Sequence, residues 1–282
     1  MTNPYFAKAS QGKDEQWLLE EKYSDVATPE YEADKKRLAL GEPLGYVIGH
    51  QPFLGLKIFL DSHPLIPRPE TEWWTEQLLS MLVDSPMGRF SVALRAARPS
   101  LTTENLPTGS FKHEHGAVQF LDLCAGSGAI GCAALKTLPY MEVFFGEVDP
   151  AHEATILKNI RENNLDESRA HVRIGDLFEP FGNMQFDCIA ANPPYIPTGR
   201  VLDASVADYE PSLALYAGGD GLSLLRCIAA GLPKHLAPGG AAWVECDSAH
   251  AEAARALFAE QGLVAEICHD QYGVPRVIVV SR

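Results

Sequence analysis

From residue 118 onward, apolar segments typical of strands alternate with longer segments that have the periodicity of helices. Such alternation predicts a parallel sheet covered by helices on both faces, with ligands bound at the carboxyl ends of the strands. The last two strands are separated by residues 270–275 alone, too few for a crossover helix, so we expect an antiparallel pair at one edge. The sequence therefore predicts an α/β fold with a seven-stranded, mostly parallel, doubly wound sheet. The predicted strands cover residues 118–123, 141–147, 171–174, 186–191, 241–246, 264–269 and 276–280, and the predicted helices cover 129–138, 150–164, 222–235 and 249–261.

The residues before this region predict a smaller N-terminal unit, made of helices and a β-hairpin. Helices are expected over residues 14–22 and 29–41, the second with Thr28 as its N-cap. Residues 53–60 are typical of a strand with a bend at Gly55, and residues 71–83 are typical of an amphipathic helix. Proline and glycine interrupt residues 84–116, which we interpret as a linker or insertion. The expected division is a small unit over 1–61, a connecting helix with the insertion over 62–117, and the main domain over 118–282.

An acidic balance of charge limits the partners that the chain can have. Its 23 lysines and arginines stand against 37 aspartates and glutamates, which gives a formal net charge of −14. A surface of that sign repels a phosphate backbone, so we expect a small molecule or a basic protein as partner and no nucleic acid.

Several further features favour a cytoplasmic protein. No run of about 18 apolar residues is present to span a membrane, and the N-terminus lacks the apolar segment and small-residue cleavage site of a secretory signal. The six cysteines lie mostly within apolar runs and have no C-x-x-C spacing, so we expect buried, reduced thiols and no metal site.

A glycine-rich turn follows the first strand of the main domain. Gly126, Gly128 and Gly131 form a G-x-G-x-x-G pattern, in which the missing side chains let a ligand approach the backbone. Glu147 ends the next strand, where a carboxylate can bind a ribose diol, so the two features together predict a nucleoside-containing cofactor. Asp149 is an alternative for that role.

Two cofactors compete for this turn. A dinucleotide places its pyrophosphate at the helix N-terminus, where amide donors favour negative charge. S-adenosylmethionine has a cationic sulfonium and an ammonium group instead, which would suit the acidic Asp122 at the end of the first strand. Asp176 and Leu177, after the third strand, predict contacts to an adenine amine and ring, although Asp176 taken alone is more typical of a cap.

The tetrapeptide from Asn192 to Tyr195 follows the fourth strand directly. Its prolines, Pro193 and Pro194, remove two backbone donors and stiffen the loop. A planar NH2 group can donate to the Asn192 side-chain oxygen and to the Pro193 carbonyl, while Tyr195 offers a flat face for stacking. These acceptors favour methyl transfer to an amide-like nitrogen, since they stabilise the positive charge that develops there. Alignment of nitrogen, methyl and sulfur accounts for the rest, without a strong general base.

Taken together, these residues resemble the release factor glutamine methyltransferases of the HemK/PrmC type, a family of class I S-adenosylmethionine-dependent methyltransferases. The resemblance rests on the loop at residues 121–128, Glu147 and the Asn-Pro-Pro-Tyr sequence, and it extends over most of the chain from Gly41. Further matching segments are Gly-Glu-Pro-Leu-Gly-Tyr at 41–46, Pro-Arg-Pro-Glu-Thr-Glu at 67–72, Tyr-Glu-Pro-Ser at 209–212 and Gly-Gly-Asp-Gly at 218–221.

The resemblance implies S-adenosylmethionine as cofactor and, as substrate, the side-chain amide of the glutamine in the Gly-Gly-Gln motif of peptide chain release factors. It implies catalytic roles for Asn192, Pro193 and Tyr195, which hold that glutamine together with Pro194. Residues around the cofactor are expected to be Asp122, Cys124, Ala125, Gly126, Ser127, Gly128, Glu147, Asp176, Leu177 and Asn192. Arg68 and Glu70 are expected to border the substrate, or alternatively to form an ion pair that ties the connecting helix to the sheet. Glu210 and Pro211 either close the pocket or end their loop.

The chain departs from the family pattern in three places. Cys124-Ala125 stands where Gly-Thr is more usual, Glu147 replaces a more frequent Asp, and the region before Gly41 is expected to be shorter than the helical domain of bacterial members. Alternative functions are methylation of a glutamine in a ribosomal protein, methylation of an adenine amine, an NAD-binding oxidoreductase, and an inactive binding protein. We expect a monomer, because the substrate is a protein loop.

Overall fold

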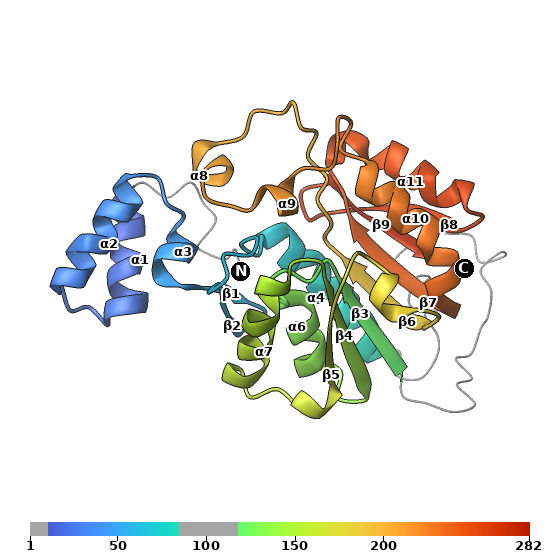
Figure 1. Cartoon of the computed structure of the whole chain (residues 1–282), viewed down its shortest axis with the longest axis horizontal. Helices are drawn as coiled ribbons and strands as arrows, with labels where there is room; N and C mark the ends of the chain where they lie inside the picture. Colours follow the sequence, from blue (N-terminus) through green and yellow to red (C-terminus); the bar gives the residue numbers. More distant parts are fainter. Residues whose placement is uncertain (1–10, 85–117) are drawn as a thin grey trace.

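The structure, a computed structural model, describes residues 11–84 and 118–282. A seven-stranded sheet with the order β5-β4-β3-β6-β7-β9-β8 forms its centre (Figure 1). Pairing is parallel from β5 to β7 and antiparallel where β9 meets β7 and β8. The predicted doubly wound sheet and its antiparallel edge pair are therefore confirmed. The strands are β3 (Val118–Leu123), β4 (Met141–Glu147), β5 (Ala170–Ile174), β6 (Phe186–Ala191), β7 (Leu236–Glu245), β8 (Val264–His269) and β9 (Pro275–Ser281).

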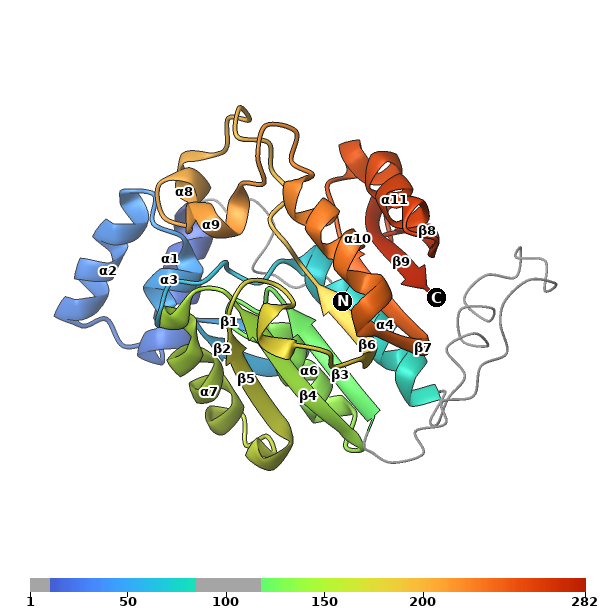
Figure 2. The same ribbon diagram turned by 45° about the vertical axis from the view of Figure 1, so that its right-hand side comes forward.

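Helices cover both faces of the sheet, as Figure 2 shows from a second angle. One apolar core joins β3 and β4 to α4 (Pro69–Asp84), α6 (Ala129–Thr137) and α7 (Glu153–Glu162). A second core, on the opposite face, contains side chains of α10 (Ser223–His235) and α11 (Ala251–Glu260). The helix predicted over 150–164 is divided, since a 3-10 turn at Pro150–His152, capped by Asp149, precedes α7.

Within residues 11–61, the N-terminal unit contains three helices and a hairpin. Helices α1 (Gln11–Tyr23), α2 (Pro29–Ala39) and α3 (Leu44–Ile48) share a small core of their own. The single strand expected over 53–60 is wrong, because β1 (His50–Phe53) and β2 (Leu56–Phe59) pair antiparallel on either side of a turn at Leu54 and Gly55. Both turn residues have positive φ, a conformation that Gly55 adopts without steric cost. Gly55 therefore marks a reversal of the chain and not a bend.

The hairpin connects the N-terminal unit to the sheet. Phe53, Leu56 and Ile58 lie in the same core as α4 and α6. Asn159, on α7, accepts a hydrogen bond from the Phe59 backbone N–H at 2.7 Å and donates to the Phe59 and Ser127 carbonyls at 3.0 and 2.8 Å. One buried amide therefore links the hairpin to the glycine turn.

Three sequence predictions concern the chain as a whole. The segment interpreted as a linker or insertion, residues 84–116, lies outside the described residues apart from its first. Within residues 11–84 and 118–282, no helix combines the length and apolarity needed to cross a membrane. All six cysteines are free, but only Cys132, Cys188 and Cys246 are buried. The expectation of uniformly buried thiols is wrong, because Cys227 is exposed on α10 and Cys124 is half-buried beside the cavity described below.

Candidate active site

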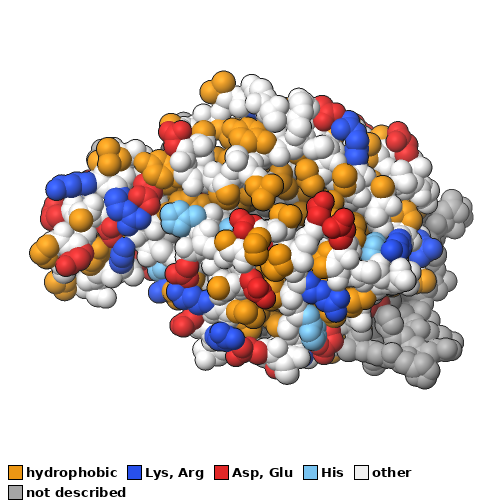
Figure 3. Space-filling view, viewed as in Figure 1, with side chains coloured by type: hydrophobic (Ala, Val, Ile, Leu, Met, Phe, Trp, Pro, Cys, Tyr) orange, Lys and Arg blue, Asp and Glu red, His pale blue; other side chains and the backbone are white. Residues whose placement is uncertain are grey.

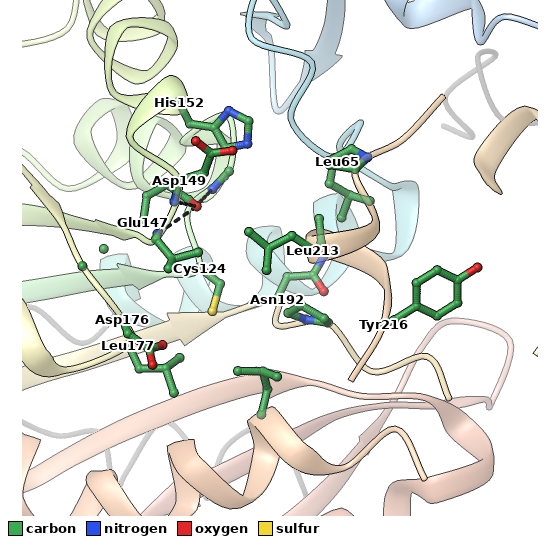
Figure 4. A pocket seen from close by; sticks show the side chains of 18 residues that line it. Leu65, Cys124, Glu147, Asp149, His152, Asp176, Leu177, Asn192, Leu213 and Tyr216 are labelled. Atoms are coloured by element: carbon green, nitrogen blue, oxygen red, sulfur yellow. Dashed lines mark hydrogen bonds between the residues drawn. The ribbon is translucent and has the colours of Figure 1, made fainter. Parts of the chain in front are cut away.

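A cavity of about 360 Å³ opens at the carboxyl ends of the central parallel strands. Cys124 follows β3, Glu147 ends β4, Asp176 follows β5 and Asn192 follows β6, and all four line the cavity (Figure 4). The volume lies in the usual range for ligand pockets, and the carboxyl edge of such a sheet is where ligands bind. The other lining residues are Leu65, Gly126, Gly146, Val148, Asp149, His152, Gly175, Leu177, Pro194, Pro211, Leu213, Ala214, Tyr216 and Leu224.

Each of the three glycines in the turn is required by a different structural feature. Gly131 permits close packing, because a Cβ there would lie 2.2 Å from Cε1 of Phe145. Gly126 has a φ of 55° and lines the cavity, and a Cβ there would meet nothing closer than Pro64 at 3.9 Å. Its missing side chain therefore leaves space and backbone free for a ligand. Gly128 adopts a φ of 78° at the N-cap of α6 and is buried.

Glu147 presents its carboxylate at the edge of this cavity. Its Oε2 accepts a hydrogen bond from Gly126 N–H at 2.7 Å, and its Oε1 accepts from Val148 and Asp149 N–H at 2.9 Å each. These three amides hold the carboxylate in one orientation, and a carboxylate has about four acceptor positions, so capacity for a hydroxyl remains. Asp149 also lines the cavity and accepts from Ala151 N–H at 2.8 Å, so the alternative for the ribose stays open.

Asp122 does not line the cavity, which corrects its expected position beside a cofactor. The residue is fully buried, and its Oδ2 accepts a hydrogen bond from Gly131 N–H at 2.8 Å. Burial raises the pKa of this carboxyl well above its usual range. Asp122 therefore holds the glycine turn from beneath, outside the lining of the cavity.

Asn192 is anchored to helix α4 and to the end of β7. Its Nδ2 donates to Thr71 Oγ1 at 3.1 Å, and the Thr71 hydroxyl donates to Glu245 Oε2 at 2.7 Å. Trp74 Nε1 donates to the same oxygen at 2.7 Å, and the Tyr195 hydroxyl donates to Glu245 Oε1 at 3.0 Å. Burial raises the pKa of Glu245, while the hydrogen bonds from Trp74, Thr71 and Tyr195 lower it. The buried carboxylate of Glu245, which is 174 positions after Thr71 in the sequence, thus fixes the Asn-Pro-Pro-Tyr loop.

Tyr195, which is half-buried, and Pro193 are not among the residues that line the cavity. The Tyr195 hydroxyl is committed to Glu245, and burial raises the pKa of that phenol well above its usual range. Pro193 is buried, so of this loop only Asn192 and Pro194 reach the cavity lining. The Tyr195 hydroxyl is thus directed to the β7 carboxylate, and the expected stacking of its ring on a substrate stays a prediction.

The opposite wall is formed by residues 209–221. This segment is tied to the Asn-Pro-Pro-Tyr loop by a bridge between Ile196 and Tyr216 and by the bond from Ala217 N–H to the Ile196 carbonyl at 2.9 Å. Gly221 is required here, since a Cβ would lie 2.5 Å from the Tyr195 carbonyl oxygen. Two segments that the sequence singled out separately are therefore one structural unit.

Glu210 clamps this wall to the segment before α4. Its Oε1 accepts from Arg68 and its Oε2 accepts from Ile66 N–H at 3.2 Å, with the Glu210 side chain only 1% exposed. Arg68 and Glu70 do not line the cavity. The charge of Glu70 raises the pKa of Arg276, against the effect of burial. Of the two readings for Arg68, the ion pair is therefore the one observed, although its partner lies in the wall segment.

The cavity brings together seven of the residues predicted from the sequence: Cys124, Gly126, Glu147, Asp176, Leu177, Asn192 and Pro194. Ala125, Ser127 and Gly128 belong to the same turn but lie outside the lining. Sequence reasoning missed Leu65, His152, Leu213, Tyr216 and Leu224, whose apolar or isolated character gives no local signal. It also missed Thr71, Trp74 and Glu245, although a glutamate at the end of an apolar strand is itself a sign of a buried polar network.

Comparison with known proteins assigns the family. Residues 101–208 match the sequence family described as "Methyltransferase small domain". A release factor glutamine methyltransferase of Geobacter sulfurreducens is 34% identical over 245 residues, which cover 86% of this chain and 74% of the relative. Proteins of the same name from Thermodesulfovibrio yellowstonii and Bordetella pertussis are 33% and 34% identical and are covered to 77% and 83% of their length.

The chain belongs to the release factor glutamine methyltransferase family. The resemblance drawn from the sequence motifs is thereby confirmed, as is the prediction that the chain is a methyltransferase. In this methyltransferase, each of the four strands from β3 to β6 places a residue, at or just after its carboxyl end, in the lining of the cavity.

Proposed function

We propose that this chain transfers a methyl group from S-adenosylmethionine to the side-chain amide nitrogen of a protein glutamine, the one in the Gly-Gly-Gln motif of a peptide chain release factor. The observation that carries the proposal is that Glu147, on the cofactor side, and Asn192, on the substrate side, line one and the same cavity. The names of the relatives support the substrate.

The charges of the cavity fit S-adenosylmethionine. Three carboxylates, those of Glu147, Asp149 and Asp176, line it, while no described lining residue is a lysine or arginine. Such a site suits a cationic sulfonium and an ammonium group and disfavours the pyrophosphate of a dinucleotide. We infer that Gly126 and Cys124 approach the cofactor from β3, that Glu147 or Asp149 binds the ribose, and that Asp176 and Leu177 contact the adenine. When bound, the cofactor supplies an electrophilic methyl group.

The chain itself contributes orientation and acceptors. An amide nitrogen is a weak nucleophile because its lone pair is delocalised, and it gains positive charge as the methyl group arrives. The Asn192 side-chain oxygen would accept a hydrogen bond from one amide hydrogen. The backbone carbonyl of Pro193, between the lining residues Asn192 and Pro194, would accept the other, and both would stabilise that charge. Leu65, Leu213 and Tyr216 line the same cavity, and with a substrate bound they would keep water from these bonds and strengthen them. The reaction then depends on alignment, and no general base is needed.

The partner and the domain roles complete the proposal. Leu213, on α9 (Ser212–Leu215) at the cavity, is 59% exposed, and Val201, in the loop before α8 (Ala204–Ala207), is 94% exposed. Hydrophobic side chains also gather near the middle of this face, below α8 and α9 (Figure 3). We infer that residues 1–61 form a recognition unit, residues 62–117 a connection and residues 118–282 the catalytic domain. The enzyme would act as a monomer in the cytoplasm and would bind a basic release factor around this opening.

Two measurements test the proposal. Thermal unfolding with S-adenosylhomocysteine or with NADH identifies the cofactor, since only a ligand of the native state raises the melting temperature. We expect stabilisation by S-adenosylhomocysteine, and stabilisation by NADH alone would contradict the assignment. Incubation with labelled S-adenosylmethionine and separate release factors, ribosomal proteins and DNA identifies the substrate. Label on a ribosomal protein or DNA and on no release factor would refute the proposed substrate.

A further inference from the structure

The buried network behind Asn192 determines which way its amide points. Trp74 Nε1 can only donate, so Glu245 Oε2 acts as an acceptor toward it at 2.7 Å. The Thr71 hydroxyl has a single proton, and that proton is directed to the same Glu245 oxygen at 2.7 Å. Only lone pairs of Thr71 Oγ1 are left to face Asn192, so the atom of the amide that lies 3.1 Å away must be the donor Nδ2.

The opposite rotamer of the amide is disfavoured. It would place the Asn192 oxygen against an oxygen whose only proton is already committed, which leaves two acceptors face to face. Thr71, Trp74 and Glu245 are at most 3% exposed, so water does not compete for these bonds. Among the described residues, no hydrogen bond is made to Asn192 Oδ1, and Asn192 lines the cavity.

We propose that Thr71 and Glu245 are positioning residues, which hold the Asn192 amide with its oxygen toward the substrate and so make the site select an amide over a carboxylate. This inference rests on the proposed function, because it assumes that Asn192 accepts from the substrate amide. A glutamine offers N–H donors to a fixed oxygen, whereas a glutamate at the same place would bring a negative oxygen against it. Specificity would thus originate in helix α4, outside the cavity lining.

The decisive variant is Thr71→Val, which keeps the shape of the side chain and removes its hydroxyl. The Asn192 amide is then free to rotate and to present its NH2 group to the substrate. We expect kcat for a release factor to fall about tenfold to a hundredfold through lost alignment, with unchanged affinity for S-adenosylhomocysteine. A release factor with glutamate in place of the methylated glutamine should bind about three- to tenfold better to T71V than to the wild type, measured as a competitive inhibitor.

The chain provides a matched control one turn further along the same helix. Thr75 is fully buried, and its hydroxyl has no hydrogen-bond partner among the described residues, so Thr75→Val makes the same chemical change without touching the network. We expect T75V to keep the wild-type kcat and inhibition constant. Thr71→Ser restores the hydroxyl and should recover most of the activity and the discrimination against glutamate.

The outcomes separate the inference from the function on which it rests. Equal kcat values for T71V and T75V, a parallel loss of cofactor affinity in T71V, or unchanged discrimination against glutamate would each overturn the positioning role. Failure of the wild type to methylate a release factor glutamine would overturn the proposed function instead. The amide orientation itself can be followed without substrate, because hydrogen exchange of the Asn192 side-chain NH2 should be slow in the wild type and T75V and fast in T71V. Fast exchange in all three would also overturn the inference.

Discussion

The contact between Arg68 and Glu210 is expected to stabilise both the fold and the cavity wall. The Glu210 side chain is 1% exposed and that of Arg68 is 29% exposed, so the ion pair is mostly shielded from solvent. Glutamine at position 210 keeps one acceptor but turns an NH2 group toward either Arg68 or Ile66 N–H, both of which are donors. Since a hydrogen bond to a charged group contributes about 1.5–3 kcal/mol, we expect Glu210→Gln to lower the free energy of unfolding by about 2 kcal/mol.

A double-mutant cycle with Glu210→Gln and Arg68→Met isolates the pairwise energy, measured by denaturant unfolding. We expect a coupling of about 1.5–2.5 kcal/mol, in the range of partners that share one network. The contact between Asp220 and Arg226 is the control, because its side chains are 52% and 48% exposed and such surface pairs contribute about 0–1 kcal/mol. A coupling at Arg68–Glu210 no larger than in the control would refute the reasoning. The KM for the release factor should rise in E210Q, since Glu210 directly precedes the wall residues Pro211, Leu213 and Tyr216.

Three further predictions concern single residues. Asn192→Ala should abolish methyl transfer while the dissociation constant of S-adenosylhomocysteine, measured by calorimetry, stays nearly unchanged; retained transfer would contradict its role. Glu147→Ala should weaken S-adenosylhomocysteine binding about tenfold or more by the same measurement, through loss of a charged acceptor, and equal affinity would favour Asp149 as the ribose ligand. Burial, with a smaller effect of Lys57, lowers the pKa of His50 from 6.5 to about 4. As the pH falls from 6.5 to 4, the unfolded chain therefore binds a proton at His50 before the folded chain does, and the free energy of unfolding decreases. That loss amounts to at most about 3 kcal/mol, and His50→Gln should remove it from the difference between unfolding curves at pH 7 and pH 4.

The local pattern of apolar residues was sufficient to predict the strands of the sheet. Strands β3, β4, β6 and β8 begin and end at the predicted residues, because each is an apolar run bounded by turn residues or by a change of periodicity. The β-hairpin was predicted, but residues 53–60 were interpreted as one strand, because Leu54 occupies a turn position with positive φ, which leucine rarely adopts. The five-residue helix α3 is too short to show a helical period.

The candidate site was predictable only where its residues follow strands. Glu147 and Asn192 end or follow β4 and β6, so the topology of a parallel sheet brings them to one edge. The contacts of Thr71 and Trp74 with Glu245 join residues more than 170 positions apart, and no local pattern encodes such a distance. Asp122 was expected beside the cofactor because it lies near the end of β3. Its burial depends on how α6 packs against the strand, which the local sequence does not show.

The most direct test of the central claim is the position of the transferred methyl group. A release factor methylated by this chain is digested, and tandem mass spectrometry locates the added group. The account predicts a methyl group on the side-chain nitrogen of the glutamine in the Gly-Gly-Gln motif with the wild type and none with N192A. A methyl group on any other residue, or an equal yield with N192A, would contradict it.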